Sequence, residues 1–208
     1  MSNILIKCYD KTMDVEIEAK FTKVNHDTLR EKLKNIGGTC ERPLTLMKRV
    51  VYHPNDDSLD AYFRVRDEGD RVTMTYKQFD DASSIHGVKE IETVVGDYDA
   101  TVAILDRTGM SRETYQETRR EVWRLDDVEI MLDEWPWVEP FVEIEGPTEE
   151  AVRAVSEKFG FDWSMAVYGG VASVYVEKYK NMGKDAHVII NRRTPVIRFE
   201  DPVPENFR

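Results

Sequence analysis

The sequence has few of the features that mark disulfide-stabilised, zinc-thiolate or membrane-spanning proteins. Its two cysteines, Cys8 and Cys40, do not form a C-x-x-C motif, and we expect them to be reduced thiols of a cytosolic protein. It contains no run of about 18 apolar residues. The N-terminal sequence MSNILIKCYD also lacks the basic and apolar regions of a signal peptide. We therefore expect a soluble, cytoplasmic protein.

Positive charge is scarce as well. The 208 residues include 29 Lys and Arg against 40 Asp and Glu, so the formal net charge is −11. This balance argues against nonspecific attraction to nucleic acid or to an anionic membrane, and we expect neither as a partner. A chain of this length suits one domain, or at most two very small ones, since domains usually have roughly 100–200 residues. It is long enough to bury a core without disulfides.

Glycine-rich phosphate loops and histidine ligand motifs are absent. The sequences GDYD at 96–99 and NMGKD at 181–185 lack the strand, glycine-rich loop and helix of a P-loop, and its GK[ST] ending. A P-loop nucleotide site is therefore excluded. The four histidines have no ligand spacing, and we expect them at the surface or at element edges and outside the chemistry: His26, His53, His86 and His187.

Hydrophobic periodicity predicts an α+β fold. Period-two alternation predicts eight strands, at roughly 14–22, 47–53, 61–67, 71–79, 88–95, 116–125, 128–134 and 139–146. Apolar residues at helical spacing, followed by glycine, predict three helices, over 27–38, 97–109 and 148–160. The sequence DEGD at 67–70 is a hairpin turn signal. Prolines after Thr194 predict an extended, peripheral tail over 194–208, which leaves 1–193 as the folded domain.

Charged side chains occupy one face of most predicted strands. Because side chains alternate along a strand, Glu16, Glu18 and Lys20 share a face opposite Val15 and Ile17. The same pattern places further charges on the equivalent faces of other strands: Arg64, Arg66, Lys77, Glu90, Glu92, Arg120, Asp133, Glu143 and Glu145. For any single strand, an antiparallel sheet with one solvated face would explain such alternation.

Repeated pairs of like charges are harder to explain by solvent exposure alone. Glutamates two residues apart on one strand face repel one another, more strongly where water is scarce, so opposite charges or bound cations must compensate them. The sequence VEIE occurs at 15–18 and again at 142–145, each time before a predicted helix, which is compatible with a two-fold pseudo-repeat. If the helices cover the apolar faces, the charges line a curved or closed sheet. An eight-stranded barrel has a narrow interior that suits a small, highly charged ligand.

The ordered set of these motifs resembles a known family. VEIEAKF at 15–21 is similar to the ExExK signature of the CYTH superfamily, or triphosphate tunnel metalloenzymes, which includes class IV adenylate cyclases, thiamine triphosphatases and inorganic triphosphatases. The resemblance continues over about residues 14–160 through YFRVRDEG, VTMTYK, KEIE, TRREVW and LDEWPWVEPFVEIEG. It implies a closed, eight-stranded antiparallel barrel with a charged interior, covered by about three main helices.

The resemblance also implies roles for the charged residues. Metal-coordinating or metal-orienting carboxylates would be Glu16, Glu18, Asp133, Glu143 and Glu145. The triphosphate would be bound by Lys20, Arg64, Arg66, Lys77 and Arg120. Lys20, Arg120 and Glu16 would be catalytic. Glu90 and Glu92 would support the site, either by facing a second metal or by holding the basic residues in place. Carboxylate oxygens suit Mg²⁺ or Mn²⁺, and the planar fork of arginine matches phosphate oxygens.

We expect a triphosphatase that releases the terminal phosphate of inorganic triphosphate, ATP or thiamine triphosphate. A class IV adenylate cyclase, which would form cyclic AMP and pyrophosphate, is the alternative. One position departs from the family, because relatives often have lysine where this chain has Thr118. Arg119 would replace that lysine only if the strand register differed. Thr118 favours a further alternative, a non-catalytic nucleotide or polyphosphate sensor. A homodimer remains compatible with the sequence.

Aromatic residues near the acidic strand and the C-terminus are expected to serve packing. Trp135 and Trp137 flank Pro136, and we expect both to pack at the rim of the barrel, with stacking on a base or a thiamine ring as the alternative. The tyrosines that follow are expected to pack the C-terminal segment onto the barrel: Tyr168, Tyr175 and Tyr179.

Overall fold

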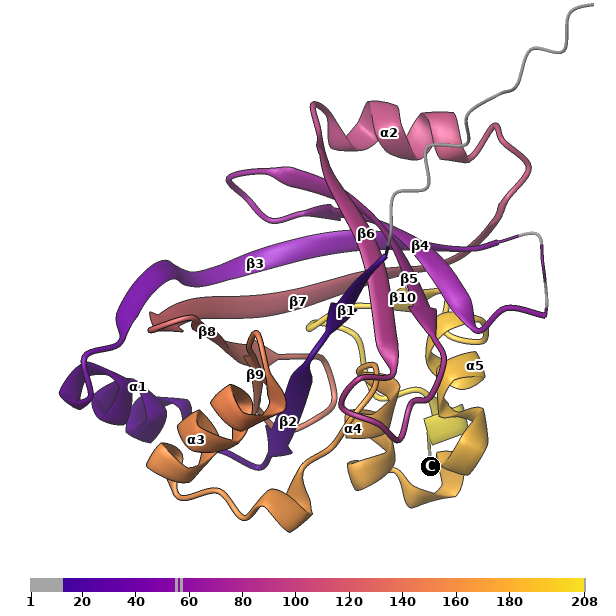
Figure 1. The fold of residues 1–208 in the computed structure, drawn as a ribbon. Coiled ribbons are helices and arrows are strands. Elements are labelled where there is room, and N and C mark those ends of the chain that lie inside the picture. The colour runs from indigo at the N-terminus through magenta and orange to yellow at the C-terminus, as the bar shows by residue number, and fades with distance from the viewer. Residues whose placement is uncertain (1–12, 55, 57, 208) are drawn as a thin grey trace, which may run out of the picture.

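The central element is an antiparallel sheet that is nearly closed into a barrel (Figure 1). The computed structural model describes residues 13–207 except 55 and 57, so Cys8 lies outside the described part, and Cys40 is a free thiol. Within this part, nine strands follow the order β1-β6-β5-β4-β3-β7-β8-β9-β2. Their bounds are β1 (Asp14–Glu16), β2 (Glu18–Thr22), β3 (Thr39–His53), β4 (Ala61–Asp67), β5 (Val72–Phe79), β6 (Val88–Val95), β7 (Ser111–Leu125), β8 (Val128–Glu134) and β9 (Phe141–Glu145). The predicted α+β fold with an antiparallel barrel is confirmed.

The two ends of the sheet are joined by one chain segment, 14–22, whose first half pairs with β6 and whose second half pairs with β9. In β1, Glu16 lies opposite Val88 of β6, whereas in β2, Lys20 lies opposite Glu143 of β9. A single residue, Ile17, separates β1 from β2. The predicted strand 14–22 is therefore two strands, and each of the other predicted strands is found as one. In this register the second VEIE sequence, at 142–145, lies opposite residues 18–21, so the two VEIE sequences meet only at Glu18 and Glu145.

Two strands begin earlier than predicted. β3 starts at Thr39 instead of 47, and β7 starts at Ser111 instead of 116. The first half of β3 shifts register against β7 between Cys40 and Arg42 and again between Arg42 and Thr45. Such irregular pairing interrupts the period-two pattern, which is why alternation did not reveal this half of the strand.

Helices lie on the outside of the barrel (Figure 1). Three correspond to the predicted helices: α1 (His26–Asn35), α2 (Tyr98–Leu105) and α3 (Glu149–Phe159). Each of these is preceded by an N-cap residue whose side chain accepts a hydrogen bond from the backbone N–H three residues further on: Asn25, Asp97 and Thr148. Among the described residues, no helix is long and apolar enough to cross a membrane.

The C-terminal region contains helices that the sequence did not predict. They are α4 (Ala172–Lys178) and α5 (Ala186–Asn191), and three 3₁₀ turns also occur, at Trp163–Met165, Lys180–Asp185 and Glu205–Phe207. α4 and α5 have only 7 and 6 residues, and neither has a side-chain cap. A helix this short shows too few turns to establish a periodic pattern.

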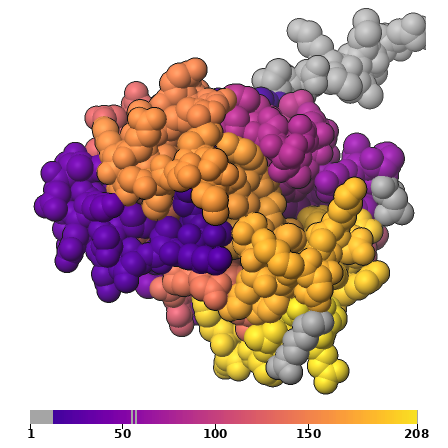
Figure 2. Space-filling model, turned by 90° about the horizontal axis from the view of Figure 1, so that it is seen from below, coloured from indigo at the N-terminus to yellow at the C-terminus, as the bar shows by residue number. Residues whose placement is uncertain are grey.

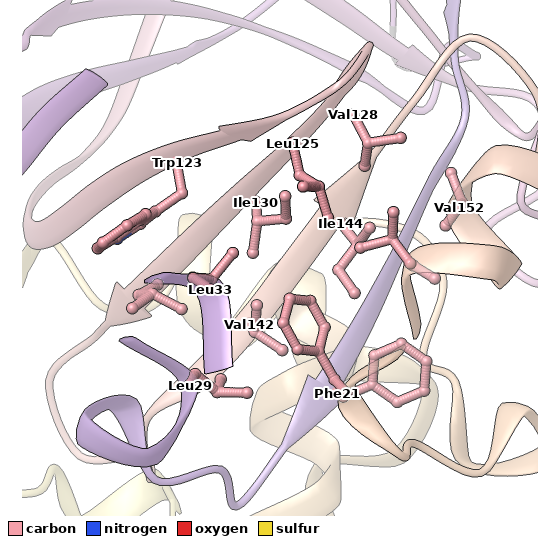
Figure 3. Packing of buried hydrophobic residues seen from close by; sticks show 14 of the residues in the cluster. Phe21, Leu29, Leu33, Trp123, Leu125, Val128, Ile130, Val142, Ile144 and Val152 are labelled. Carbon is pink, nitrogen blue, oxygen red and sulfur yellow. The ribbon is translucent and has the colours of Figure 1, made fainter. Parts of the chain in front are cut away.

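Apolar side chains on the outer face of the sheet pack against the helices. Figure 3 shows Leu33 of α1 and Val152 of α3 on the same side of the sheet as Ile130 and Ile144 of β8 and β9. A separate cluster joins α2 to β3 and β4 through Leu105 and its neighbours. Burial of these outer faces leaves the charged face of each strand directed into the barrel.

The C-terminal segment packs on the barrel through aromatic residues, as expected. The hydroxyl of Tyr175 donates to the Pro136 carbonyl, and that of Tyr179 donates to the Trp137 carbonyl, each at 2.7 Å. Tyr168 packs against the α1 and α3 cluster.

Residues after Thr194 are attached at two points. Val196–Ile197 forms β10, which pairs in parallel with β7, and Phe207 is fully buried beside Tyr175. Figure 2 shows the residues near the C-terminus, in yellow, at one side of the molecule, next to the amber segment that precedes them.

Candidate active site

The inward faces of the strands surround a cavity of about 270 Å³. The structure brings all but one of the predicted site residues to its wall: Glu16, Glu18, Lys20, Arg64, Arg66, Lys77, Glu90, Glu92, Arg120, Glu143 and Glu145. Asp133 is the exception, because it is fully buried behind the wall. Predicted residues that are up to 129 positions apart in the sequence, such as Glu16 and Glu145, therefore share one cavity.

The charges are sorted by strand around the barrel. Four adjacent strands, β5, β4, β3 and β7, supply a basic wall made of Lys77, Arg64, Arg66, Arg49 and Arg120. The strands that complete the circuit, β8, β9, β2, β1 and β6, supply an acidic wall made of Glu129, Glu143, Glu145, Glu18, Glu16, Glu90 and Glu92. An anion and a cation can therefore be bound side by side in the same cavity.

Three carboxylates of the acidic wall form a compact group. Oxygen atoms of Glu18, Glu143 and Glu145 lie within 4.8 Å of one another. Burial raises the pKa of Glu18 well above its usual value, and burial, Glu16 and Glu143 raise the pKa of Glu145 to about 7. This crowding of buried carboxylates is unfavourable unless a cation balances it. Oxygen donors at this spacing can bind a hard divalent metal ion.

Lys20 stands within the acidic wall. Its Nζ lies 2.5 Å from Glu18 Oε1 and 3.4 Å from Glu143 Oε2, and it donates to the Gly169 carbonyl at 2.8 Å. Burial lowers the Lys20 pKa, but the two carboxylates outweigh burial, so the pKa is raised. In this arrangement Lys20 is a protonated hydrogen-bond donor.

Two further cations are held by carboxylates. Lys77 Nζ lies 2.6 Å from Glu16 Oε2 and 3.5 Å from Glu90 Oε2. Arg120 donates through Nε and Nη2 to the two oxygens of Asp133, each at 2.7 Å. Asp133 is thus linked to the cavity through Arg120, whose orientation it fixes.

The two arginines of β4 share one carboxylate of β6. Arg64 Nη2 lies 3.4 Å from Glu92 Oε2 and donates to the Thr75 hydroxyl at 3.0 Å. Arg66 Nη2 lies 3.8 Å from the same Glu92 oxygen. Glu90 and Glu92 therefore contact the basic residues of the wall.

Arg49 is a cavity residue that the sequence analysis missed. Its guanidinium is buried, donates to the Thr118 hydroxyl at 2.8 Å and lies 4.6 Å from the centre of the Trp135 ring. Among the described residues no carboxylate lies within 4.0 Å of it, and its Nε has no hydrogen-bond partner. Burial and the neighbouring arginines lower its pKa well below the usual value. Among the described residues, the Arg49 charge thus has no paired carboxylate, and an anion in the cavity could balance it.

Thr118 lies next to that unbalanced charge. It faces the barrel interior, whereas Arg119 faces outward, where it pairs with Glu134 at 3.2 Å and stacks on Phe199. The strand register therefore excludes Arg119 as a substitute for the lysine found in relatives. Arg49, from the neighbouring strand, supplies the cation beside Thr118.

Other wall residues that the sequence analysis missed come from the C-terminal region. α4 and α5 contribute Ala172, His187, Ile190 and Asn191, and Asn191 accepts a hydrogen bond from Gln116 at 3.0 Å. These contacts join segments distant in sequence, and no local pattern signals them.

The aromatic and histidine predictions have mixed outcomes. Trp135 lies on the wall and Trp137 packs away from it, donating to the Asp201 carbonyl at 2.7 Å. The histidines are not all at the surface: His26 and His53 are buried at element ends, and His187 lines the cavity.

Comparisons with known proteins agree with this geometry. A family model described as the CYTH domain matches residues 14–164, whereas no curated protein matches the chain. Among solved structures, a Pyrococcus horikoshii OT3 protein is 21% identical with a TM-score of 0.63, covering 73% of this chain and 93% of its own. A second protein from that organism is 25% identical with a TM-score of 0.58, covering 78% and 99%. A candidate adenylate cyclase from Vibrio parahaemolyticus is 14% identical with a TM-score of 0.65, covering 78% and 98%. Since the family model spans well over half of its length, the chain belongs to the CYTH domain family.

Proposed function

We propose that the chain is a divalent-metal-dependent triphosphatase that releases the terminal phosphate of a small triphosphate. The observation that carries this proposal is the basic wall, with its unbalanced Arg49, next to a compact carboxylate group. The carboxylates alone would repel a polyphosphate, and binding of a polyphosphate by the basic wall alone would not explain the compact carboxylate group. A metal ion together with a triphosphate satisfies both walls at once.

The carboxylates fit Mg²⁺ or Mn²⁺. Glu18, Glu143 and Glu145 would hold the ion, since their oxygens are close enough to share it and both metals prefer oxygen ligands. When bound, the metal supplies Lewis-acid polarisation of the phosphoryl oxygens. Glu16 and Asp133 would orient the site through Lys77 and Arg120.

The chain's own cations would carry most of the phosphate binding. The residues of the basic wall would hold the three phosphates: Arg49, Arg64, Arg66, Lys77 and Arg120. Protonated Lys20, between Glu18 and Glu143, would donate to the phosphoryl group that is transferred. Water attacks the γ-phosphorus, the bond to the bridging oxygen breaks, and these fixed donors stabilise the charge that develops on the oxygens.

The size of the cavity favours a small substrate. Its volume of about 270 Å³ falls just below the roughly 300–1,000 Å³ that is typical of sites for drug-sized ligands. The Trp135 ring, which is the clearest platform for a base, is already covered by the Arg49 guanidinium. We therefore expect inorganic triphosphate to be at least as good a substrate as ATP or thiamine triphosphate.

Product identity tests the proposal against its alternatives. The purified protein is incubated with inorganic triphosphate, ATP and thiamine triphosphate in turn, with Mg²⁺ or Mn²⁺, and the products are resolved by phosphorus NMR. We expect orthophosphate and a diphosphate. Cyclic AMP with pyrophosphate would instead identify an adenylate cyclase, and metal-dependent binding without any product would identify a sensor.

A further inference from the structure

A buried carboxylate outside the cavity contacts the basic wall from behind. Glu68 directly follows β4, and its side chain is 1% exposed. Its Oε1 accepts a hydrogen bond from Arg66 Nε at 2.7 Å. Its Oε2 accepts from Arg42 Nη1 at 2.8 Å and from Arg71 Nε at 2.9 Å. Arg66 and Arg71 line the cavity, whereas Glu68 does not.

The backbone of the turn fixes where this carboxylate lies. Glu68 N–H donates to the Arg71 carbonyl at 2.9 Å, which closes a tight turn between β4 and β5. Gly69 has a φ of +91°, a region that favours glycine, and an added Cβ there would lie 3.0 Å from Thr45. The DEGD sequence is thus more than a hairpin signal, because its glutamate is turned back under the sheet.

The charges around Arg66 show why it needs a partner at its back. Burial and Arg64, with a further contribution from Arg120, lower the pKa of Arg66 to about 10 against the opposing effect of Glu68. Its other carboxylate neighbour, Glu92, is 3.8 Å away. Without Glu68, like charges on the cavity side would drive the Arg66 guanidinium out of the wall.

We propose that Glu68 is a positioning residue that holds Arg66 in the basic wall and Arg71 at its edge, in the orientation that binds a polyphosphate chain. This inference rests on the proposed function, since it assigns the phosphate contact to Arg66. Glu68 acts through the two arginines and does not touch the substrate. The buried carboxylate and its three arginines form one network, in which each charge-assisted hydrogen bond restricts a flexible side chain.

The two roles that a buried carboxylate can have here predict effects of opposite sign. If Glu68 only neutralises charge, Glu68→Gln removes a negative charge beside the site, and a polyanion should bind more tightly. If Glu68 positions Arg66, the same change should weaken binding, although the site becomes more positive. The direction in which Glu68→Gln changes the affinity for a polyanion therefore distinguishes the two roles.

Calorimetric titration with inorganic triphosphate, without divalent metal, measures this direction. We expect Glu68→Gln to bind about tenfold more weakly than the wild type, because a charge-assisted contact is lost. In an Arg66→Ala background, Glu68→Gln should add at most about twofold, since the contact it supports is already gone. Asp70→Asn is the matched control, because it removes a carboxylate from the same turn that does not contact Arg66, and it should bind no more weakly than the wild type.

A variant with a shorter acidic side chain separates the effect of carboxylate position from the effect of charge. It also keeps the inference testable if Glu68→Gln fails to fold. Glu68→Asp keeps the charge but withdraws the carboxylate by one methylene, so we expect weaker binding with a melting temperature that still reports a folded protein. Unchanged or tighter binding by Glu68→Gln, or unchanged binding by Glu68→Asp, would overturn the inference while the proposed function stands. Absence of binding in the wild type, both in this titration and in one with Mg²⁺ and a non-hydrolysable imido analogue of triphosphate, would contradict the proposed function, and the inference would fall with it.

Discussion

Arg49 carries a positive charge that the surrounding protein does not balance. Its guanidinium is buried among other arginines, with a hydroxyl and an aromatic ring as its contacts. Arg49→Met keeps the length of the side chain but removes the charge. We expect the ligand-free protein to unfold at a higher temperature, since an uncompensated buried charge costs about 1 kcal/mol or more.

The same substitution should weaken triphosphate binding. A charge-assisted hydrogen bond contributes roughly 1.5–3 kcal/mol, so calorimetry should show roughly 10- to 150-fold lower affinity. Arg119→Met on β7 is the control, because Arg119 faces outward and pairs with Glu134 near the surface, and both quantities should stay near wild type. A lower melting temperature with unchanged affinity would assign Arg49 to packing instead.

Glu143 lies where the two walls meet. One carboxylate oxygen of Glu143 is 3.4 Å from Lys20 Nζ and 3.6 Å from Arg120 Nη2. Burial raises the pKa of Glu143, but the two cations outweigh burial, so the pKa lies well below its usual value. It therefore stays ionised and available as a metal ligand. We expect Glu143→Gln to reduce the affinity for Mn²⁺ sharply in a calorimetric titration with the fold intact, whereas Glu134→Gln, on the outer face, should leave it unchanged. Equal affinity in both variants would remove Glu143 from the metal site.

At the scale of strands, alternation was enough to predict most of the site. A strand places every second side chain on one face, so runs such as Glu16, Glu18 and Lys20 could be assigned to the interior once their apolar neighbours were assigned to the helices. Alternation does not assign a face where two charged residues are adjacent or where the chain is not in a strand. Arg49 follows Lys48, and two adjacent charges do not show which of them faces inward. Glu68 lies in a turn, where alternation does not apply.

The C-terminal helices show a different limit of the sequence. α4 and α5 are short and uncapped, and tertiary contacts define them: Tyr175 packs beneath Phe207, and Asn191 binds Gln116. Such contacts join residues that are distant along the chain, so no local window contains the signal. The distance of Asp133 from the cavity could not be predicted either, because it depends on Arg120 lying between them.

The C-terminal tail contacts the rest of the protein through the aromatic ring of Phe207. We propose that 194–208 is an extended tail of the domain formed by 1–193, and that Phe207 anchors it. Phe207 is fully buried against Tyr175, Tyr179 and Trp137, so Phe207→Ala should lower the free energy of unfolding by about 3–5 kcal/mol. Phe199→Ala, in a partly exposed position of the same tail, should cost much less. Similar denaturant midpoints for the two variants would show that the tail is not anchored at Phe207.

For the molecule as a whole, the net charge of −11 conceals a division into two walls of opposite sign. A metal ion adds positive charge next to the carboxylates, and a triphosphate adds negative charge next to the arginines. When both are bound, they attract each other across a cavity of about 270 Å³, where little water screens them. Their binding should therefore be positively cooperative, and by linkage each ligand should raise the affinity of the other by the same factor.

This cooperativity can be measured without turnover. Mn²⁺ is titrated calorimetrically into the protein with and without a non-hydrolysable imido analogue of triphosphate, and a titration without protein corrects for the metal that the analogue binds in solution. We expect the analogue to raise the Mn²⁺ affinity by roughly 5- to 150-fold, the usual range of coupling between sites. In Arg64→Ala, which keeps the carboxylate group but weakens the basic wall, the gain should shrink while the affinity for Mn²⁺ alone stays close to wild type. An Mn²⁺ affinity that does not respond to the analogue would mean that the two walls act independently and that no shared site exists between them.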